Sequence, residues 1–238
     1  MLQKALAYIV GLAENKTYTI NGETYSDNQL HRVAPYVPRA ATIEVNGLDS
    51  IVKLVRNELE TFGGRILFIR VEGPRRVFVF TELDEDMERE GLYRAVCDAP
   101  DFKQGWREQE AAIIELRSAF IPNQDVDYLL DLLSRVSKEE GVTSEDNGVS
   151  QTVTAKQGIM LKRLEMVKPR VSLSPYRTFT EVEQPESEFI LRLDDEGRVG
   201  LFEADGGKWK MDAKARVAAY FETALAEETD KGRVVVMM

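Results

Sequence analysis

The chain has 238 residues, 43% of them hydrophobic and 30% charged, which is the composition of an ordinary globular protein. Its net charge of −10 disfavours phosphate-backbone binding over the whole surface, although an acidic protein can still carry a local basic stripe. No apolar run approaches the roughly 18 to 20 residues of a membrane helix, and no small-residue cleavage site follows the first residues. We therefore expect a soluble cytoplasmic protein.

The chain has one cysteine and one histidine, which limits the catalytic and metal-binding sites that it can form. Cys97 is the only cysteine, which excludes an intramolecular disulfide and a thiolate metal cluster. His31 is the only histidine, so it alone could serve a Ser-His or Cys-His pair. It lies in a proline-rich connecting segment, where a surface or packing role is the simpler interpretation. We expect no metal and no cofactor.

The first hundred residues alternate between helix and strand patterns. The opening residues carry apolar side chains at helical spacing, and Asn21-Gly22 between two β-prone runs predicts a hairpin. A strand is expected over 41–45, followed by a helix capped by Asp49 and stopped after Phe62 by two glycines. The runs around the Gly-Pro turn at 73–74 predict two strands, and 92–100 a third.

Two helices and then a β-rich region follow. One helix should end before Pro122, and the next should begin at Asn123 or Asp125 and run to about residue 137. The polar stretch 139–148 is the best boundary, giving an α+β region over 1–138 and a β-rich region over 149–238, or one continuous domain. The second region should hold several antiparallel strands, a helix over 212–228 and a terminal strand. We expect an α+β fold with mixed, largely antiparallel sheets.

The terminal strand VVVMM has two interpretations. A bare apolar strand must be paired or covered, so it either completes the sheet of its own chain or pairs with another subunit. The second possibility favours a homo-oligomer.

The acidic stretch SPYRTFTEVEQPESEFILRL (174–193) raises the question of a catalytic site. Glu181 and Glu183 would point the same way on an extended strand. A Mg²⁺-dependent phosphodiesterase could use Glu183 with Glu203, Asp205 and Lys208. This spacing does not match the usual nuclease pattern, and solvated strand faces around a bend at Pro185 are the stronger interpretation of the acids.

The string FEADGGKW (202–209) can likewise be interpreted as a functional site or as a structural feature. Its two glycines could present N–H groups to an anion, or could form a tight turn. Trp209 would pack on the last helix or mark a binding surface. Residues of this string and of the acidic stretch form the candidate binding set: Arg177, Arg192, Glu203, Asp205, Lys208 and Trp209.

Four strings carry a resemblance to a known family. IPNQDVDYLLDLL, DNGVSQTVTAKQG, the acidic stretch and LFEADGGKWKM are similar to the signature strings of the YfdQ-like family of uncharacterised bacteriophage and prophage proteins. The resemblance covers most of the chain from about Ile121 onward, and the N-terminal half more loosely. It implies a phage or prophage origin and an intracellular protein, and it carries over no catalytic residue.

Three functions remain open. The leading one is a non-enzymatic phage accessory protein that assembles with itself and binds a host or phage partner or a small ligand. The second is a nucleic-acid-binding protein of a phage replication or recombination region, and the third is the phosphodiesterase above. The nucleic-acid hypothesis would use two basic clusters: Arg65, Arg70, Arg75 and Arg76, and Lys156, Lys162, Arg163, Lys168 and Arg170.

Overall fold

The computed structural model confirms an α+β fold with mixed, largely antiparallel sheets. It describes residues 3–6, 8, 16–26, 39–100, 102–136, 142–146, 151–155, 163–194 and 197–238. His31, Lys156 and Lys162 lie outside these residues. Residues 1–40 form one compact unit and residues 41–238 another, and each is described by itself.

The first unit contains the predicted hairpin. Strands β1 (Thr17–Ile20) and β2 (Glu23–Ser26) pair antiparallel around Asn21-Gly22. Asn21 has a φ of 53° and Gly22 a φ of 84°, the positive values that a type I′ turn requires. Of the predicted opening helix, residues 3–6 and 8 are helical.

A five-stranded sheet forms the first half of the second unit. Its order is β14-β4-β5-β6-β3, with β14 parallel to β4, β3 parallel to β6, and antiparallel pairs between. The strands are β3 (Ile43–Val45), β4 (Leu67–Gly73), β5 (Arg76–Thr81), β6 (Gly91–Val96) and β14 (Val234–Met237). The terminal strand therefore completes the sheet of its own chain.

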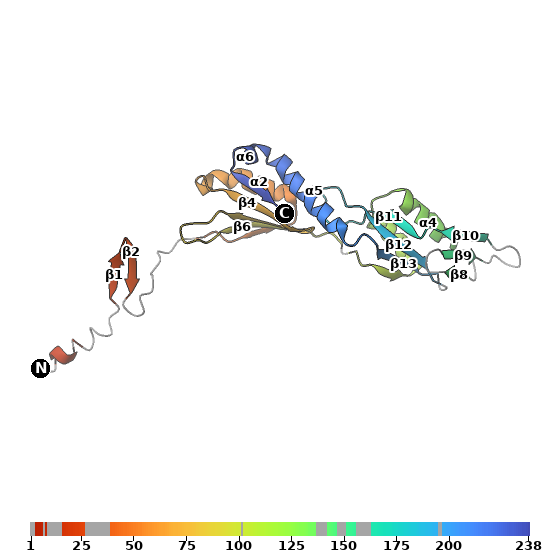
Figure 1. Ribbon diagram of the computed structural model, residues 1–238, viewed down its shortest axis with the longest axis horizontal. Coiled ribbons are helices and arrows are strands. Elements are labelled where there is room, and N and C mark those ends of the chain that lie inside the picture. Colours follow the sequence, from red (N-terminus) through yellow and green to blue (C-terminus); the bar gives the residue numbers. More distant parts are fainter. Residues whose placement is uncertain are drawn as a thin grey trace. The chain divides into compact units, whose positions relative to one another are not determined.

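Helices cover one face of this sheet (Figure 1). They are α2 (Leu48–Glu58) with the 3-10 turn η1 (Leu59–Phe62), α5 (Lys208–Ala224) and α6 (Ala226–Asp230). The two central strands contribute aliphatic side chains to the core between the layers, because Leu67, Ile69 and Val71 of β4 and Val77 and Val79 of β5 are all fully buried. Burial of such side chains stabilises a fold by about 1.5–3 kcal/mol each.

A four-stranded sheet with its own core forms the other half of the second unit. Its order is β11-β12-β13-β7, all antiparallel. The strands are β7 (Gly105–Arg107), β11 (Arg170–Leu173), β12 (Ser187–Leu193) and β13 (Val199–Glu203). The expected alternation is confirmed, since Phe189, Leu191 and Leu193 are buried. They pack with α3 (Gln109–Ser118) and α4 (Gln124–Val136), and Asn123 caps α4 through Val126 N–H at 2.8 Å.

A three-stranded antiparallel sheet, β10-β9-β8, completes the described elements. It consists of β8 (Val142–Asp146), β9 (Gln151–Ala155) and β10 (Arg163–Val167). The buried Gln151 side chain exchanges hydrogen bonds with the backbone of Leu193, which joins β9 to the end of β12.

Strand pairing crosses the boundary predicted at 139–148. β14 pairs with β4, and β7 pairs with β13. These pairings favour the continuous domain among the two possibilities, and the division into 1–138 and 149–238 stays a prediction. Within the described residues, no helix has both the length and the apolar character needed to cross a membrane.

Candidate functional site

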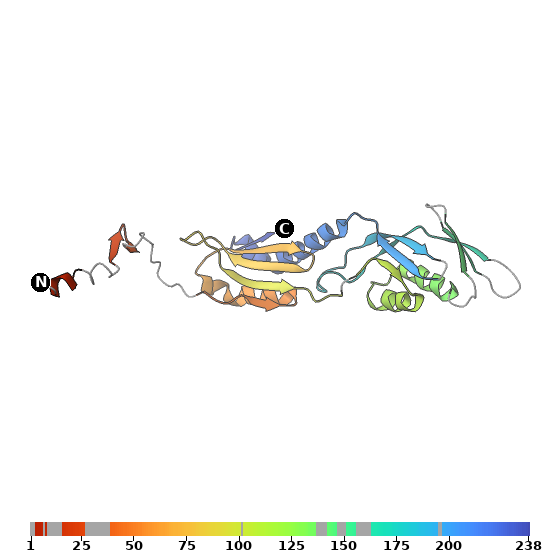
Figure 2. The same ribbon diagram turned by 90° about the horizontal axis from the view of Figure 1, so that it is seen from below.

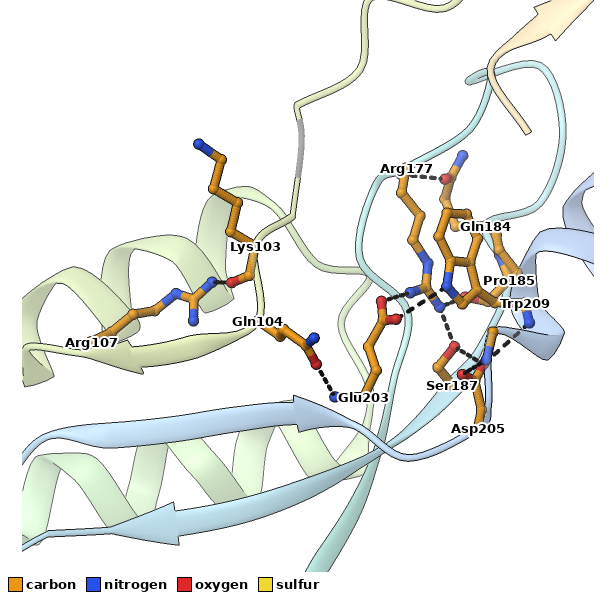
Figure 3. A network of polar contacts seen from close by, with 11 residues as sticks. Lys103, Gln104, Arg107, Arg177, Gln184, Pro185, Ser187, Glu203, Asp205 and Trp209 are labelled. Atoms are coloured by element: carbon orange, nitrogen blue, oxygen red, sulfur yellow. Dashed lines mark hydrogen bonds and ion pairs between the residues drawn. The ribbon is translucent and has the colours of Figure 1, made fainter. Parts of the chain in front are cut away.

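Four of the six candidate binding residues meet around the side chain of Arg177 (Figure 3). Arg177 is only 3% exposed. Its Nη1 donates to Glu203 Oε1 at 2.8 Å, and its Nη2 donates to Ser187 Oγ. The guanidinium also stacks on Trp209, 4.0 Å from the ring centroid. We call Arg177, Ser187, Glu203, Asp205 and Trp209 the Arg177 network.

Asp205 ties this network to the start of α5. One carboxylate oxygen accepts hydrogen bonds from Ser187 Oγ at 2.7 Å and Trp209 N–H at 3.1 Å, and the other accepts from Gly207 N–H at 2.9 Å. Gly206 and Gly207 have φ values of 64° and 81°, so the turn interpretation is correct. The N–H groups of Gly207 and Trp209, which could have bound an anion, donate instead to the carboxylate of Asp205.

Burial and charge act against each other in the network. Burial lowers the pKa of Arg177 to about 10, although the charges of Glu203 and Asp205 oppose the change. Burial raises the pKa of Asp205, but the hydrogen bonds from Ser187, Gly207 and Trp209 and the charge of Arg177 outweigh it, so the pKa is lowered. At neutral pH both groups are therefore charged, and each is neutralised from within the chain.

Two other candidates lie away from these contacts. Arg192 lies near the far end of β12, in register with Gly200 of β13, and donates to the carbonyl of Leu191. Lys208 is exposed in the first turn of α5, where its backbone N–H donates to the carbonyl of Asp205. The structure therefore does not bring the side chains of these two residues together with the other four, and their role in binding stays a prediction.

The strand expected around Glu181 and Glu183 does not form. Regular strand pairing in this stretch begins only at Ser187. Glu181 Oε1 accepts the N–H of Leu48 at 2.7 Å and so caps α2 across 133 residues. The prediction that Asp49 caps this helix is wrong, since the N-cap residue is Gly47. Glu183 is exposed and pairs with Arg216 at 3.4 Å.

Of the four residues of the phosphodiesterase hypothesis, Glu203 and Asp205 share the Arg177 network, and Glu183 and the side chain of Lys208 lie outside it. Glu183 pairs with Arg216, Glu203 with Arg177, and Asp205 caps α5. Among the described residues, no group of three or more His, Cys, Asp or Glu side chains is placed to hold a metal ion. The arrangement joins β12, β13 and α5, which is a structural role.

No protein-family model, curated protein or solved structure matches the chain.

A different surface gathers exposed groups that can bind a ligand. The sheet face opposite α2 and α5 carries the phenylalanine and arginine side chains of β4, β5 and β6. The backbone of these strands is seen from below in Figure 2. Alternation explains this, because the side chains next to the buried Leu67, Ile69, Val77 and Val79 point the other way. We call this surface the Phe-Arg face. It consists of Phe68, Arg70, Arg76, Phe78, Phe80, Arg89 and Arg94.

The rings of the Phe-Arg face form a continuous row. Phe68 and Phe80 stack at 5.6 Å between centroids with an interplanar angle of 13°, and Phe78 follows at 5.7 Å from Phe80. Phe80 is 8% exposed, and Phe68 and Phe78 are half-buried. A side chain at Gly91 would collide with Phe78, since an added Cβ would lie 2.6 Å from the ring.

Arginines lie over these rings. Arg70 lies 5.5 Å from the centroid of Phe80, Arg89 5.2 Å from Phe68, and Arg94 5.3 Å from Phe78. Arg76, Arg89 and Arg94 are exposed, and the ion pairs of the described residues include none of these three. Glu72, which pairs with Arg70, and Glu44, in register with Arg94, are the acids on the same face. The four arginines of the face outnumber these two acids, and the connection 82–90, which carries Arg89, is itself acidic.

The basic clusters expected from sequence are divided by the fold. Arg70 and Arg76 belong to the Phe-Arg face, whereas Arg65 pairs with Glu90 and Arg75 donates to the carbonyls of Cys97 and Ala99. In the second cluster, Lys168 pairs with Asp125 at 2.8 Å and Arg170 with Glu188 at 2.6 Å.

Sequence reasoning missed the phenylalanines, Arg89 and Arg94 of the Phe-Arg face. The runs LFIRV and RVFVF are mostly apolar, so they predict hydrophobic strands without indicating a binding face. A finer signal was present, because Leu, Ile and Val alternate there with Phe and Arg. That alternation distinguishes an aliphatic core face from an aromatic and cationic one.

Proposed function

We propose that this chain is a non-enzymatic protein that binds single-stranded nucleic acid on the Phe-Arg face. The observation that carries the proposal is the row of three phenylalanine rings covered by guanidinium groups on an open sheet face. Unpaired bases stack on aromatic rings and on guanidinium planes, and arginines neutralise the phosphates. A single strand fits better than a duplex, whose bases are already stacked on one another.

Binding of a labelled oligonucleotide of roughly 12 nucleotides, followed by fluorescence anisotropy at several salt concentrations, tests this proposal. Phe78→Leu keeps an apolar side chain but removes the ring, and we expect about a tenfold loss of affinity. Arg94→Ala should reduce the slope of log affinity against log salt by about 0.7. Arg170→Ala, an exposed arginine of the other sheet, is the matched control and should change the affinity little. An absence of binding by the wild-type protein at low salt would refute the proposal.

Self-assembly is the second candidate, and one observation favours it. β14 is an edge strand of its sheet, and its Val235 and Met237 are 37% and 38% exposed. Such an edge can pair with another chain. Light scattering after size-exclusion chromatography tests this, and a strict monomer at micromolar concentration would exclude it. Val235→Lys should favour the monomer.

The phage setting is proposed from the resemblance of the four strings to the YfdQ-like family. A protein of this kind would work in the cytoplasm of an infected or lysogenic cell, where replication and recombination expose single strands. The genes around its own test the proposal: a neighbourhood without phage genes would contradict it.

A further inference from the structure

A pocket of about 330 Å³ lies where β3 and β6 end. Because these strands are parallel, Asn46 and Asp98, which follow them, lie at the same edge of the sheet. The opposite wall comes from Ser118 at the end of α3 and from the segment containing Tyr176, Phe179 and Thr180. Crevices beyond the carboxyl ends of parallel strands are frequent ligand sites, and this volume lies in their usual range. We call this the strand-end pocket.

The strand-end pocket adjoins one end of the Phe-Arg face. Arg76 of that face is in register with Val96, one residue before the pocket residue Cys97. The neighbouring Arg75 donates to the carbonyls of Cys97 and Ala99, and Thr178 Oγ1 donates to the carbonyl of Pro74 at 2.5 Å. These contacts fix the β4–β5 turn against the pocket wall.

The two ends of the Phe-Arg face differ in charge. At the end away from the pocket, the β5–β6 connection ELDEDMERE (82–90) carries six carboxylates and one arginine. At the pocket end stands Arg76, which is exposed. Phosphates are repelled at the first end and attracted at the second. A bound strand is therefore expected to extend from the phenylalanines toward Arg76 and the pocket.

The residues that line the pocket suit a nucleobase better than a phosphate. None of them is a lysine, arginine or histidine. Asp98 accepts hydrogen bonds, Asn46, Ser118 and Thr180 can donate or accept them, and Phe179 supplies apolar surface. Burial raises the pKa of the Cys97 thiol, which keeps it uncharged at neutral pH. A carboxylate acceptor favours bases that present an exocyclic amino group.

We propose that the strand-end pocket accepts one nucleobase of the bound strand and selects cytosine or adenine over uracil or thymine. This inference rests on the proposed function, because the Phe-Arg face delivers the strand. The selection comes from Asp98, whose carboxylate accepts a hydrogen bond from the amino group. A base with a carbonyl at that position presents an acceptor to the carboxylate instead of a donor, which disfavours it.

Comparison of oligocytidylate with oligouridylate of equal length tests the proposal, since the two bases differ in that amino or carbonyl group and in the proton on the adjacent ring nitrogen. The wild-type protein should bind oligocytidylate about tenfold more tightly. Asp98→Asn should bring the ratio of the two affinities close to one, and Thr180→Trp, which puts a large ring in place of a small lining side chain, should do the same. Asp127→Asn, an exposed acid on α4, is the control and should leave the ratio unchanged. Deoxycytidine and thymidine oligomers repeat the comparison on the other sugar.

The outcomes separate the two proposals. Suppose that Phe78→Leu weakens binding but the wild-type protein binds the two oligomers with equal affinity. This result would refute base selection by the strand-end pocket and would still support binding on the Phe-Arg face. A cytosine preference that survives both Asp98→Asn and Thr180→Trp also refutes the pocket. If no oligomer binds, both the binding on the Phe-Arg face and the base selection by the pocket are refuted. Thermal unfolding of each variant shows whether it is folded.

Discussion

The Arg177 network and the Phe-Arg face both place arginines on aromatic rings, and they differ in what surrounds the guanidinium. In the Arg177 network the cation is buried, stacked on Trp209, and bonded to Glu203 and Ser187. On the Phe-Arg face, Arg94 lies on Phe78 but stays exposed. The first cation is neutralised within the chain, so its contacts stabilise the fold. The second keeps its charge toward solvent, where it can meet a phosphate. Residue type alone therefore does not indicate a binding site.

The largest predicted effect comes from removing the buried cation. Arg177→Ala leaves Glu203 and Asp205 without their counter-charge and opens a space beside Trp209, so we expect the free energy of unfolding to fall by about 3–5 kcal/mol. Arg94→Ala is the matched control, because Arg94 also lies on a ring but is itself exposed, and the expected change is within about 0.5 kcal/mol. Urea unfolding measures both. A loss below about 1 kcal/mol for Arg177→Ala would show that the network does not hold the fold.

A smaller effect concerns the cap of α2. Gly47→Ala would place a Cβ 2.7 Å from Glu181 Oε1, which forces the carboxylate away from Leu48 N–H. Glu181→Ala removes the same hydrogen bond, so each substitution should cost about 1 kcal/mol. The double variant should be no less stable than either single variant, because both remove one interaction. Additive losses in this cycle would show that Glu181 and Gly47 act independently.

The smallest effect is a pH dependence. The pKa of Asp205 is lowered in the folded chain, so its stabilisation is present above the unfolded pKa of about 3.9 and is lost as the pH falls through the folded value. Asp205→Asn removes this titration. The difference in unfolding free energy between wild type and variant should therefore be largest at neutral pH and shrink toward about pH 3. A difference that does not change with pH would contradict the assignment.

Local features of the chain could be predicted because they depend on neighbouring residues. The Asn21-Gly22 turn needs only its own backbone angles, Asn123 caps α4 from three residues away, and Phe189, Leu191 and Leu193 are buried by simple alternation. The candidate site was predicted in part, since residues of FEADGGKW do meet Arg177. They form a structural network there, and the side chains of Arg192 and Lys208 are not part of it.

Other features depend on which distant segments come together. Glu181 caps α2 from 133 residues away, and no local pattern marks it as a cap. Both faces of β4 and β5 are rich in apolar side chains, so the sequence by itself determined that these are strands but not which face the helices cover. Only the tertiary structure decided that α2 and α5 bury Leu, Ile and Val and leave the phenylalanines and arginines on the opposite face. The physical reason is that period-two alternation defines two faces, whereas packing chooses between them.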